Sequence, residues 1–145
     1  MVRFIVGTGL VLAALLAAFI LEGGGVLSLL GFSAFLITFF VPFFGALAVW
    51  SFREWRQAWG HAFVPSDREA AGRSVAVWKF SEVACYAAGI LGSLVGGVLI
   101  LGNLEGATTE RIAHAFGALL VSPTYGTFFG LVCRILRARV ENLSR

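Results

Sequence analysis

Long runs of uncharged, mostly apolar residues dominate the chain and are separated by short charged segments. Asp, Glu, Lys and Arg are absent from four stretches, at residues 4–21, 23–52, 83–104 and 112–133. A helix needs about 20 apolar residues to cross a hydrocarbon layer about 30 Å thick. The alternating strands of about 10 residues that build a membrane barrel do not occur in the sequence. The pattern predicts an all-α, polytopic membrane protein with four transmembrane helices, at about 4–21, 26–52, 83–104 and 112–133.

The composition agrees with this prediction. Hydrophobic residues make up 59% of the 145 positions and charged residues only 13%, whereas a soluble domain has about 25% charged residues. The first stretch follows Arg3 and contains Ala17 and Ala18, so a signal peptide is the alternative interpretation. We interpret it as a span, and the whole chain as one four-helix membrane domain.

The distribution of Lys and Arg predicts the orientation. Basic residues precede the first span, occupy residues 53–82 and follow the fourth span, whereas the other two connections contain Arg111 and three glutamates. Because basic residues are retained on the cytoplasmic side, both termini and segment 53–82 are expected there. This bias explains the formal charge of +3. A nucleic-acid partner is not expected, since no basic stripe with stacking aromatics accompanies the charge.

Segment 53–82 is expected to form two short helical extensions of the spans. Pro42 should kink the second span, which then continues as an amphipathic helix with aromatic residues on one face. Pro65 is expected to end that helix, and Ser66 with Glu69 resembles a capping box that starts the next one, running from Asp67 into span three. The aromatic face consists of Phe52, Trp55, Trp59 and Phe63.

Small residues recur every four positions in the last two spans. This spacing lets helix backbones approach closely in lipid, so the sequence predicts helix packing there, and close packing alone would explain it. The residues concerned are Gly89, Ser93 and Gly97, then Gly92 and Gly96, and finally Ser122, Gly126 and Gly130.

Hydroxyl groups lie at matched depth in the same two spans. Ser93 is about 16 Å of helix rise from the inner end of span three, and Thr124 about 15 Å from that of span four. Ser122 and Thr127 flank this depth, and Pro123 leaves a backbone carbonyl without its usual donor. Such a band can line an ion path. Alternatively, each hydroxyl donates to a carbonyl of its own helix.

The spans contain no ionisable relay of their own. Proton transfer across a bilayer generally needs one, so another chain must supply it if protons cross. Cys85 and Cys133, at the cytoplasmic ends of their spans, are interpreted as small packing residues rather than as a disulfide or a metal site. His61 and His114 are isolated near the interfaces, and no metal site, cofactor or catalytic constellation is expected. An enzyme is therefore disfavoured.

The motifs of these spans resemble the MotA/TolQ/ExbB family. Residues 89–96 read GILGSLVG and residues 101–104 LGNL, similar to the G-I-x-G-T-V-x-G and L-G-N-L of MotA. Residues 118–126 read ALLVSPTYG, similar to A-L-x-x-T-x-Y-G. Near the N-terminus, residues 21–24 read LEGG and residues 35–37 read FLI, which resemble the L-E-G-G and F-L-I-V of MotA. The resemblance covers all four predicted spans in order.

The resemblance implies an ion-driven motor subunit of the bacterial inner membrane. Family members form a homopentamer around a partner with one transmembrane helix and an essential aspartate, as in MotB, TolR and ExbD. H⁺ or Na⁺ passing that aspartate generates force, and spans three and four line the channel. The positions implied for the ion path are Ser93, Ser122, Pro123, Thr124 and Thr127. Those implied for coupling and helix packing are Tyr86, Gly89, Gly92, Gly96, Gly97, Gly126 and Gly130.

Three departures bear on that function. Tyr86 stands where MotA has a proline, and Pro123 stands where the family has the threonine of span four. The large cytoplasmic domain that grips a flagellar rotor has no counterpart, which favours a minimal unit with another client. The alternative is a structural membrane protein that uses its glycine faces only for assembly. The ion, the partner and the load stay open.

Overall fold

The computed structural model describes residues 32–64, 67–102 and 108–144, which fold entirely into helices and short connections. The helices are α2 (Phe32–Val49), α3 (Phe52–His61), α4 (Arg68–Gly102) and α5 (Thr109–Leu143). The first predicted span, the start of the second and the connection between the last two lie outside these residues. The all-α prediction is confirmed for the part of the chain that the structure describes.

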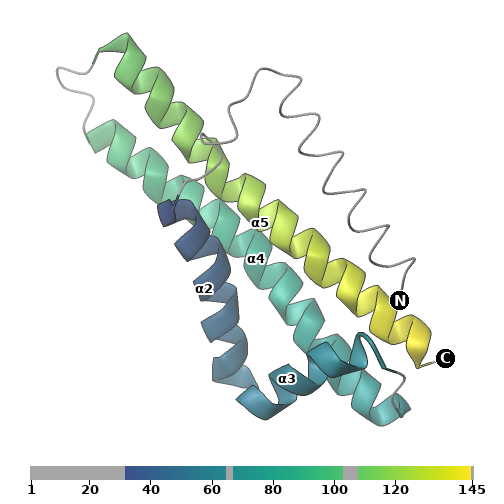
Figure 1. Cartoon of the computed structure of the whole chain (residues 1–145). Helices are drawn as coiled ribbons and strands as arrows, with labels where there is room; N and C mark the ends of the chain where they lie inside the picture. Colours follow the sequence, from purple (N-terminus) through teal and green to yellow (C-terminus); the bar gives the residue numbers. More distant parts are fainter. Residues whose placement is uncertain (1–31, 65–66, 103–107, 145) are drawn as a thin grey trace. The chain divides into compact units, whose positions relative to one another are not determined.

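Helices α4 and α5 form the antiparallel pair on which the other two helices pack (Figure 1). Helix α2 contacts both of them, and α3 packs mainly on α4. Helix α4 continues from the predicted cytoplasmic extension into the predicted third span without a break, as expected.

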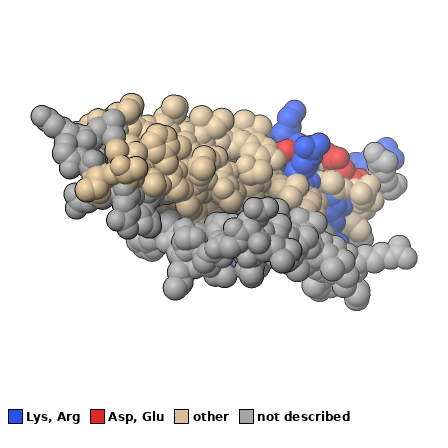
Figure 2. All heavy atoms as spheres, turned by 90° about the horizontal axis from the view of Figure 1, so that it is seen from above, with Lys and Arg blue, Asp and Glu red and all other residues tan. Residues whose placement is uncertain are grey.

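Two of the described helices are long and apolar enough to cross a membrane, and a third crossing is possible if α2 and α3 count as one bent span. This indicates a membrane protein. Lys and Arg side chains gather at one end of the face seen in Figure 2, together with Asp and Glu, while uncharged residues cover the rest of its described part. That end contains the start of α4 and the end of α5. Its cytoplasmic location stays a prediction.

The second predicted span ends earlier than expected. Helix α2 ends at Val49, continues through Pro42 as one helix, and is followed by a bend of 110° into α3. The cause is a capping box at Ser51, whose hydroxyl accepts a hydrogen bond from the Glu54 N–H while the Glu54 carboxylate accepts one from the Ser51 N–H. Because these bonds fix the start of a new helix, the chain cannot continue straight.

Helix α3 also ends before Pro65, contrary to expectation. It ends at His61, with Ala62 as its C-cap. The N–H groups of Ala62 and Phe63 bond to the carbonyls of Trp59 and Gly60, three residues back, at 3.2 and 3.0 Å. These bonds tighten the last turn and give the final carbonyls of α3 hydrogen-bond donors, so the helix ends without the help of proline. The capping box predicted at Ser66 lies outside the described residues.

The aromatic face of α3 packs against its own chain. The Trp55 ring meets Phe43 of α2 edge to face at 5.1 Å between centroids, and the Trp59 ring meets Trp78 of α4 at 4.9 Å. The Trp78 indole N–H donates to the carbonyl of Ala58 at 3.2 Å. These contacts hold α3 across the charged end of the molecule, with Trp59 still 37% exposed.

Candidate functional site

The backbones of α4 and α5 touch where the sequence predicts close helix packing. A Cβ atom added to Gly89 would lie 3.1 Å from the Cα atoms of both Pro123 and Gly126, and one added to Gly126 would lie 2.7 Å from the Cys85 carbonyl oxygen. Real Cβ atoms rarely come this close to other atoms. The α4–α5 contact therefore requires glycine at these two positions, and the packing is within one chain.

The other small residues of the pair fit around side chains. A Cβ on Gly92 would meet the Ser122 hydroxyl at 2.7 Å, and one on Gly130 would meet the Tyr86 ring at 2.5 Å. Tyr86, which stands where the family has proline, thus fills the space over Gly130. Gly96 and Gly97 make only ordinary contact with Leu119, at 3.9 and 3.4 Å from their added Cβ atoms.

Ser93 forms a hydrogen bond across the helix pair. Its hydroxyl donates to the Leu119 carbonyl of α5 at 3.0 Å. Leu119 lies four residues before Pro123, and proline has no N–H to donate to that carbonyl. The carbonyl that the sequence predicted to be left without its donor is therefore satisfied by α4. In this geometry Ser93 connects the two helices at the proline.

This arrangement predicts a rescue. Ser93→Ala should lower the free energy of unfolding by about 1 kcal/mol, since the Leu119 carbonyl loses its donor in an apolar interior. In a Pro123→Ala background, the restored backbone N–H can bond to that carbonyl, so the same substitution should cost much less. A double-mutant cycle in detergent micelles measures the difference. Equal costs in both backgrounds would contradict the pairing of Ser93 with the proline-freed carbonyl.

The Ser and Thr hydroxyls close to Pro123 in α5 divide into one buried and two exposed groups. Ser122 is 5% exposed and lies against Gly92. Thr124 and Thr127 are exposed, and their hydroxyls donate to the Leu120 and Pro123 carbonyls of their own helix at 2.8 and 2.7 Å. Because each proton is already donated, the hydroxyl oxygens that remain can only accept a hydrogen bond or coordinate a cation.

The exposed sides of α4 and α5 differ in polarity. On α4, the large exposed residues of the predicted span are all aliphatic: Val83, Ile90, Leu91, Leu94, Val95, Val98 and Leu101. On α5, Thr124 and Thr127 continue an exposed stripe from Gly117 and Leu120. Residues four and three apart share a helix face, so α5 presents two hydroxyls in its predicted span away from the other described helices.

Ser93 and Thr124 are close in depth but face different directions. Gly89 lies beside Pro123 and Gly126, and Gly92 lies beside Ser122. This register puts Thr124 about one helical turn, roughly 5 Å, from the level of Ser93. Ser93 faces the helix pair and Thr124 faces outward, so the structure does not bring the two hydroxyls together. Whether they line an ion path stays a prediction.

The charged end of the helix pair contains two contacts that the sequence analysis missed. Arg137 of α5 donates to the Glu82 carboxylate of α4 at 2.6 Å, with the Glu82 side chain only 10% exposed. The Cys85 and Cys133 thiols, both free, lie next to each other. Spacing could have found both pairs, because these residues share helix faces with Gly89 and Gly126 at intervals of four, seven or eleven.

The chemistry of the described residues includes no metal centre. Among them, no group of three or more His, Cys, Asp or Glu side chains could hold a metal ion. No family model, curated protein or solved structure matches the chain. The resemblance to the MotA/TolQ/ExbB family therefore rests on the motifs and their order.

Proposed function

We propose that this chain is a MotA-like subunit of an ion-driven rotary motor complex of the bacterial inner membrane. In this proposal, four spans with cytoplasmic termini assemble as a homopentamer around a single-span partner of the MotB, TolR or ExbD kind. The partner supplies a membrane aspartate, and H⁺ or Na⁺ passes between that aspartate and the α5 helices. The resemblance of the motifs supplies this architecture, and the exposed hydroxyls of α5 supply the chemistry.

The observation that supports the proposal best is the exposed pair Thr124 and Thr127. Both hydroxyl protons are donated within α5, but the oxygen atoms are exposed on the described part of the chain and can still accept a hydrogen bond. Their oxygens can accept a hydrogen bond from a protonated carboxyl group or coordinate a dehydrated cation. Predicted spans three and four contain no acid, so the carboxyl group has to come from another chain.

The packing of the glycines changes how a ring would form. Gly89 and Gly126 are buried in the contact between α4 and α5 of one chain. They are therefore not accessible for helix contacts between subunits. In the proposal, neighbouring subunits and lipid cover the aliphatic side of α4, and α5 faces the partner. The structural alternative is that the α5 stripe serves only assembly, which predicts no ion flux.

The test is ion flux in vesicles that contain the chain and its copurifying single-span partner. Thr124→Val with Thr127→Val keeps side-chain shape and removes both oxygens. We expect flux under an imposed gradient to fall about tenfold or more, since a hydrogen bond to a charged group contributes about 1.5–3 kcal/mol and each 1.36 kcal/mol is tenfold in rate.

A matched control is Thr38→Val in α2. Thr38 is fully buried, and its hydroxyl also donates to the carbonyl four residues back, at 2.7 Å from Ala34. Its loss should leave flux unchanged. Particle images would show whether each variant still forms a ring of five. Wild-type flux from intact complexes of the double variant would refute the ion path and leave the structural alternative.

A further inference from the structure

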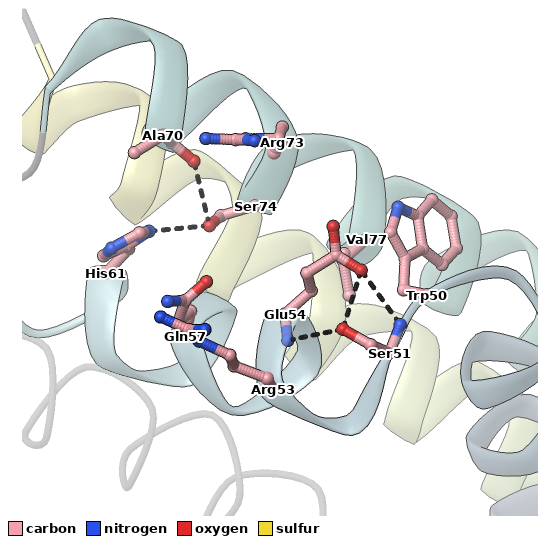
Figure 3. A pocket seen from close by; sticks show the side chains of 10 residues that line it. All are labelled: Trp50, Ser51, Arg53, Glu54, Gln57, His61, Ala70, Arg73, Ser74 and Val77. Carbon is pink, nitrogen blue, oxygen red and sulfur yellow. Dashed lines mark hydrogen bonds between the residues drawn. The ribbon is translucent and has the colours of Figure 1, made fainter.

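A polar cleft separates α3 from α4 at the charged end of the molecule (Figure 3). Its volume is about 410 Å³, within the range of about 300–1,000 Å³ typical of small-ligand sites. Arg53 and Gln57 of α3 lie on one side and Arg73 of α4 on the other, with His61 and Ser74 between them. The proposed ion path uses none of these residues.

The cleft has a net positive charge. Two guanidinium groups, from Arg53 and Arg73, oppose one carboxylate, from Glu54. The ion pairs among the described residues both involve Arg137 instead, so the two cleft arginines keep their donors for a ligand. The charges balance to one positive charge, which a singly charged phosphate diester would neutralise.

The Glu54 carboxylate is already hydrogen-bonded to Ser51, so it does not compete with such a ligand for the two arginines. Its carboxylate accepts hydrogen bonds from the Ser51 N–H and the Ser51 hydroxyl, both at 2.9 Å. These bonds, the backbone one first, lower the pKa of Glu54, and the nearby charge of Arg73 lowers it further. The carboxylate therefore stays ionised and committed to the start of α3.

A hydrogen-bonded pair, Ser74 and His61, lies inside the cleft. The Ser74 hydroxyl donates its one proton to the Ala70 carbonyl at 3.2 Å. His61 Nδ1 lies 2.8 Å from the Ser74 hydroxyl oxygen. With that proton committed, the contact requires His61 Nδ1–H to be the donor. Ser74 is 3% exposed, so this pair joins α3 to α4 and fixes the spacing of the two arginines.

Apolar groups border the cleft on the side of α2. Trp50 lines it, and its ring packs on Phe80 of α4 at 5.3 Å. The neighbouring Val49 and Phe52 are 60% and 61% exposed. Trp is favoured where membrane meets water, and exposed apolar residues there can contact acyl chains. A phosphate in this cleft would therefore be attached to a lipid.

We propose that the cleft between α3 and α4 binds the phosphate of an anionic phospholipid headgroup. Arg53 and Arg73 donate to the phosphate oxygens from opposite sides, which suits the planar donor geometry of guanidinium. Basic pockets between helices at the cytoplasmic side are a known arrangement for such headgroups. The bound lipid would join α3 to α4 and stabilise the 110° bend after α2.

The experiment measures thermal unfolding of the full chain in micelles containing phosphatidylglycerol or phosphatidylcholine. Saturating phosphatidylglycerol should raise the unfolding midpoint by roughly 5–10 °C over phosphatidylcholine. The double variant Arg53→Gln with Arg73→Gln should lose this rise. The control, Arg56→Gln with Lys79→Gln, removes one charge from each of the same helices outside the cleft and should keep it.

A second variant tests the site if the arginine variants fail to fold. Gln57→Glu changes an exposed residue and adds a negative charge to the cleft, so it should also abolish the rise. Equal midpoints in the two lipids for the wild type would overturn the proposal, as would an equal loss in the cleft and control variants. A rise produced by inorganic phosphate in phosphatidylcholine micelles would overturn the lipid assignment in favour of free phosphate.

Discussion

Gly126→Ala is expected to destabilise the protein by about 3 kcal/mol. The added methyl group would lie 2.7 Å from the Cys85 carbonyl oxygen and 2.8 Å from the Gly89 Cα atom. Both are backbone atoms that cannot rotate away, so α4 and α5 have to separate, at the upper end of the usual cost of overpacking. Separation would also lengthen the Ser93–Leu119 hydrogen bond. The measurement is the free energy of unfolding in mixed detergent micelles.

Two other glycines of α5 make the comparison specific. A Cβ on Gly117 would meet nothing within 4 Å, so Gly117→Ala should be neutral or stabilise the helix by up to about 1 kcal/mol. For Gly130→Ala, the atoms nearest to the added methyl group belong to the Tyr86 ring, which can rotate, so its cost should be intermediate. Equal effects at all three positions would mean that the backbones do not touch at Gly126.

The sequence predicted the helices of this protein better than their connections. Long uncharged stretches and four-residue spacing are properties of one helix at a time, so span three and the glycine contact could be predicted. The bend after α2 was not, although Ser51 and Glu54 have the spacing of a capping box. Ser51 lies near the end of the uncharged stretch at 23–52, so it was interpreted as part of the second span. Pro65 was predicted to end α3, whereas the tightened turn after His61 ends it.

The sequence predicted the depth of the candidate site residues along the helices better than the side of the helix on which each lies. Pro123 was expected to free a carbonyl, and the Leu119 carbonyl is the acceptor concerned. Which hydroxyl reaches it depends on the rotation of α4 about its axis, and depth alone cannot give that rotation. Ser93 faces the helix pair, whereas Thr124 is exposed on the described part of the chain. The role of both residues in an ion path stays a prediction.

Pairs between helices depend on the same missing information. Cys85 and Cys133 were interpreted as small packing residues without a contact between them, and no partner was predicted for Glu82. Once Gly89 is set against Gly126, the heptad-like spacing puts each residue opposite its partner. One correct contact between α4 and α5 would thus have been enough to predict the thiol contact and the ion pair.

The Glu82–Arg137 ion pair gives the second large effect. Arg137→Leu should lower the free energy of unfolding by about 3 kcal/mol, because it leaves an unpaired carboxylate whose side chain is only 10% exposed. This is the lower end of the usual range of 3–5 kcal/mol, since the Arg137 side chain is 25% exposed and partly solvated.

The matched controls separate the buried charge from other losses. Glu141 lies 3.6 Å from Arg137 Nε but is 46% exposed, so Glu141→Gln should change stability by no more than about 0.5 kcal/mol. Adding Glu82→Gln to Arg137→Leu should recover part of the loss, because no charge then remains without a partner. A double variant no more stable than Arg137→Leu alone would show that Arg137 acts through packing of its aliphatic stem rather than by neutralising Glu82.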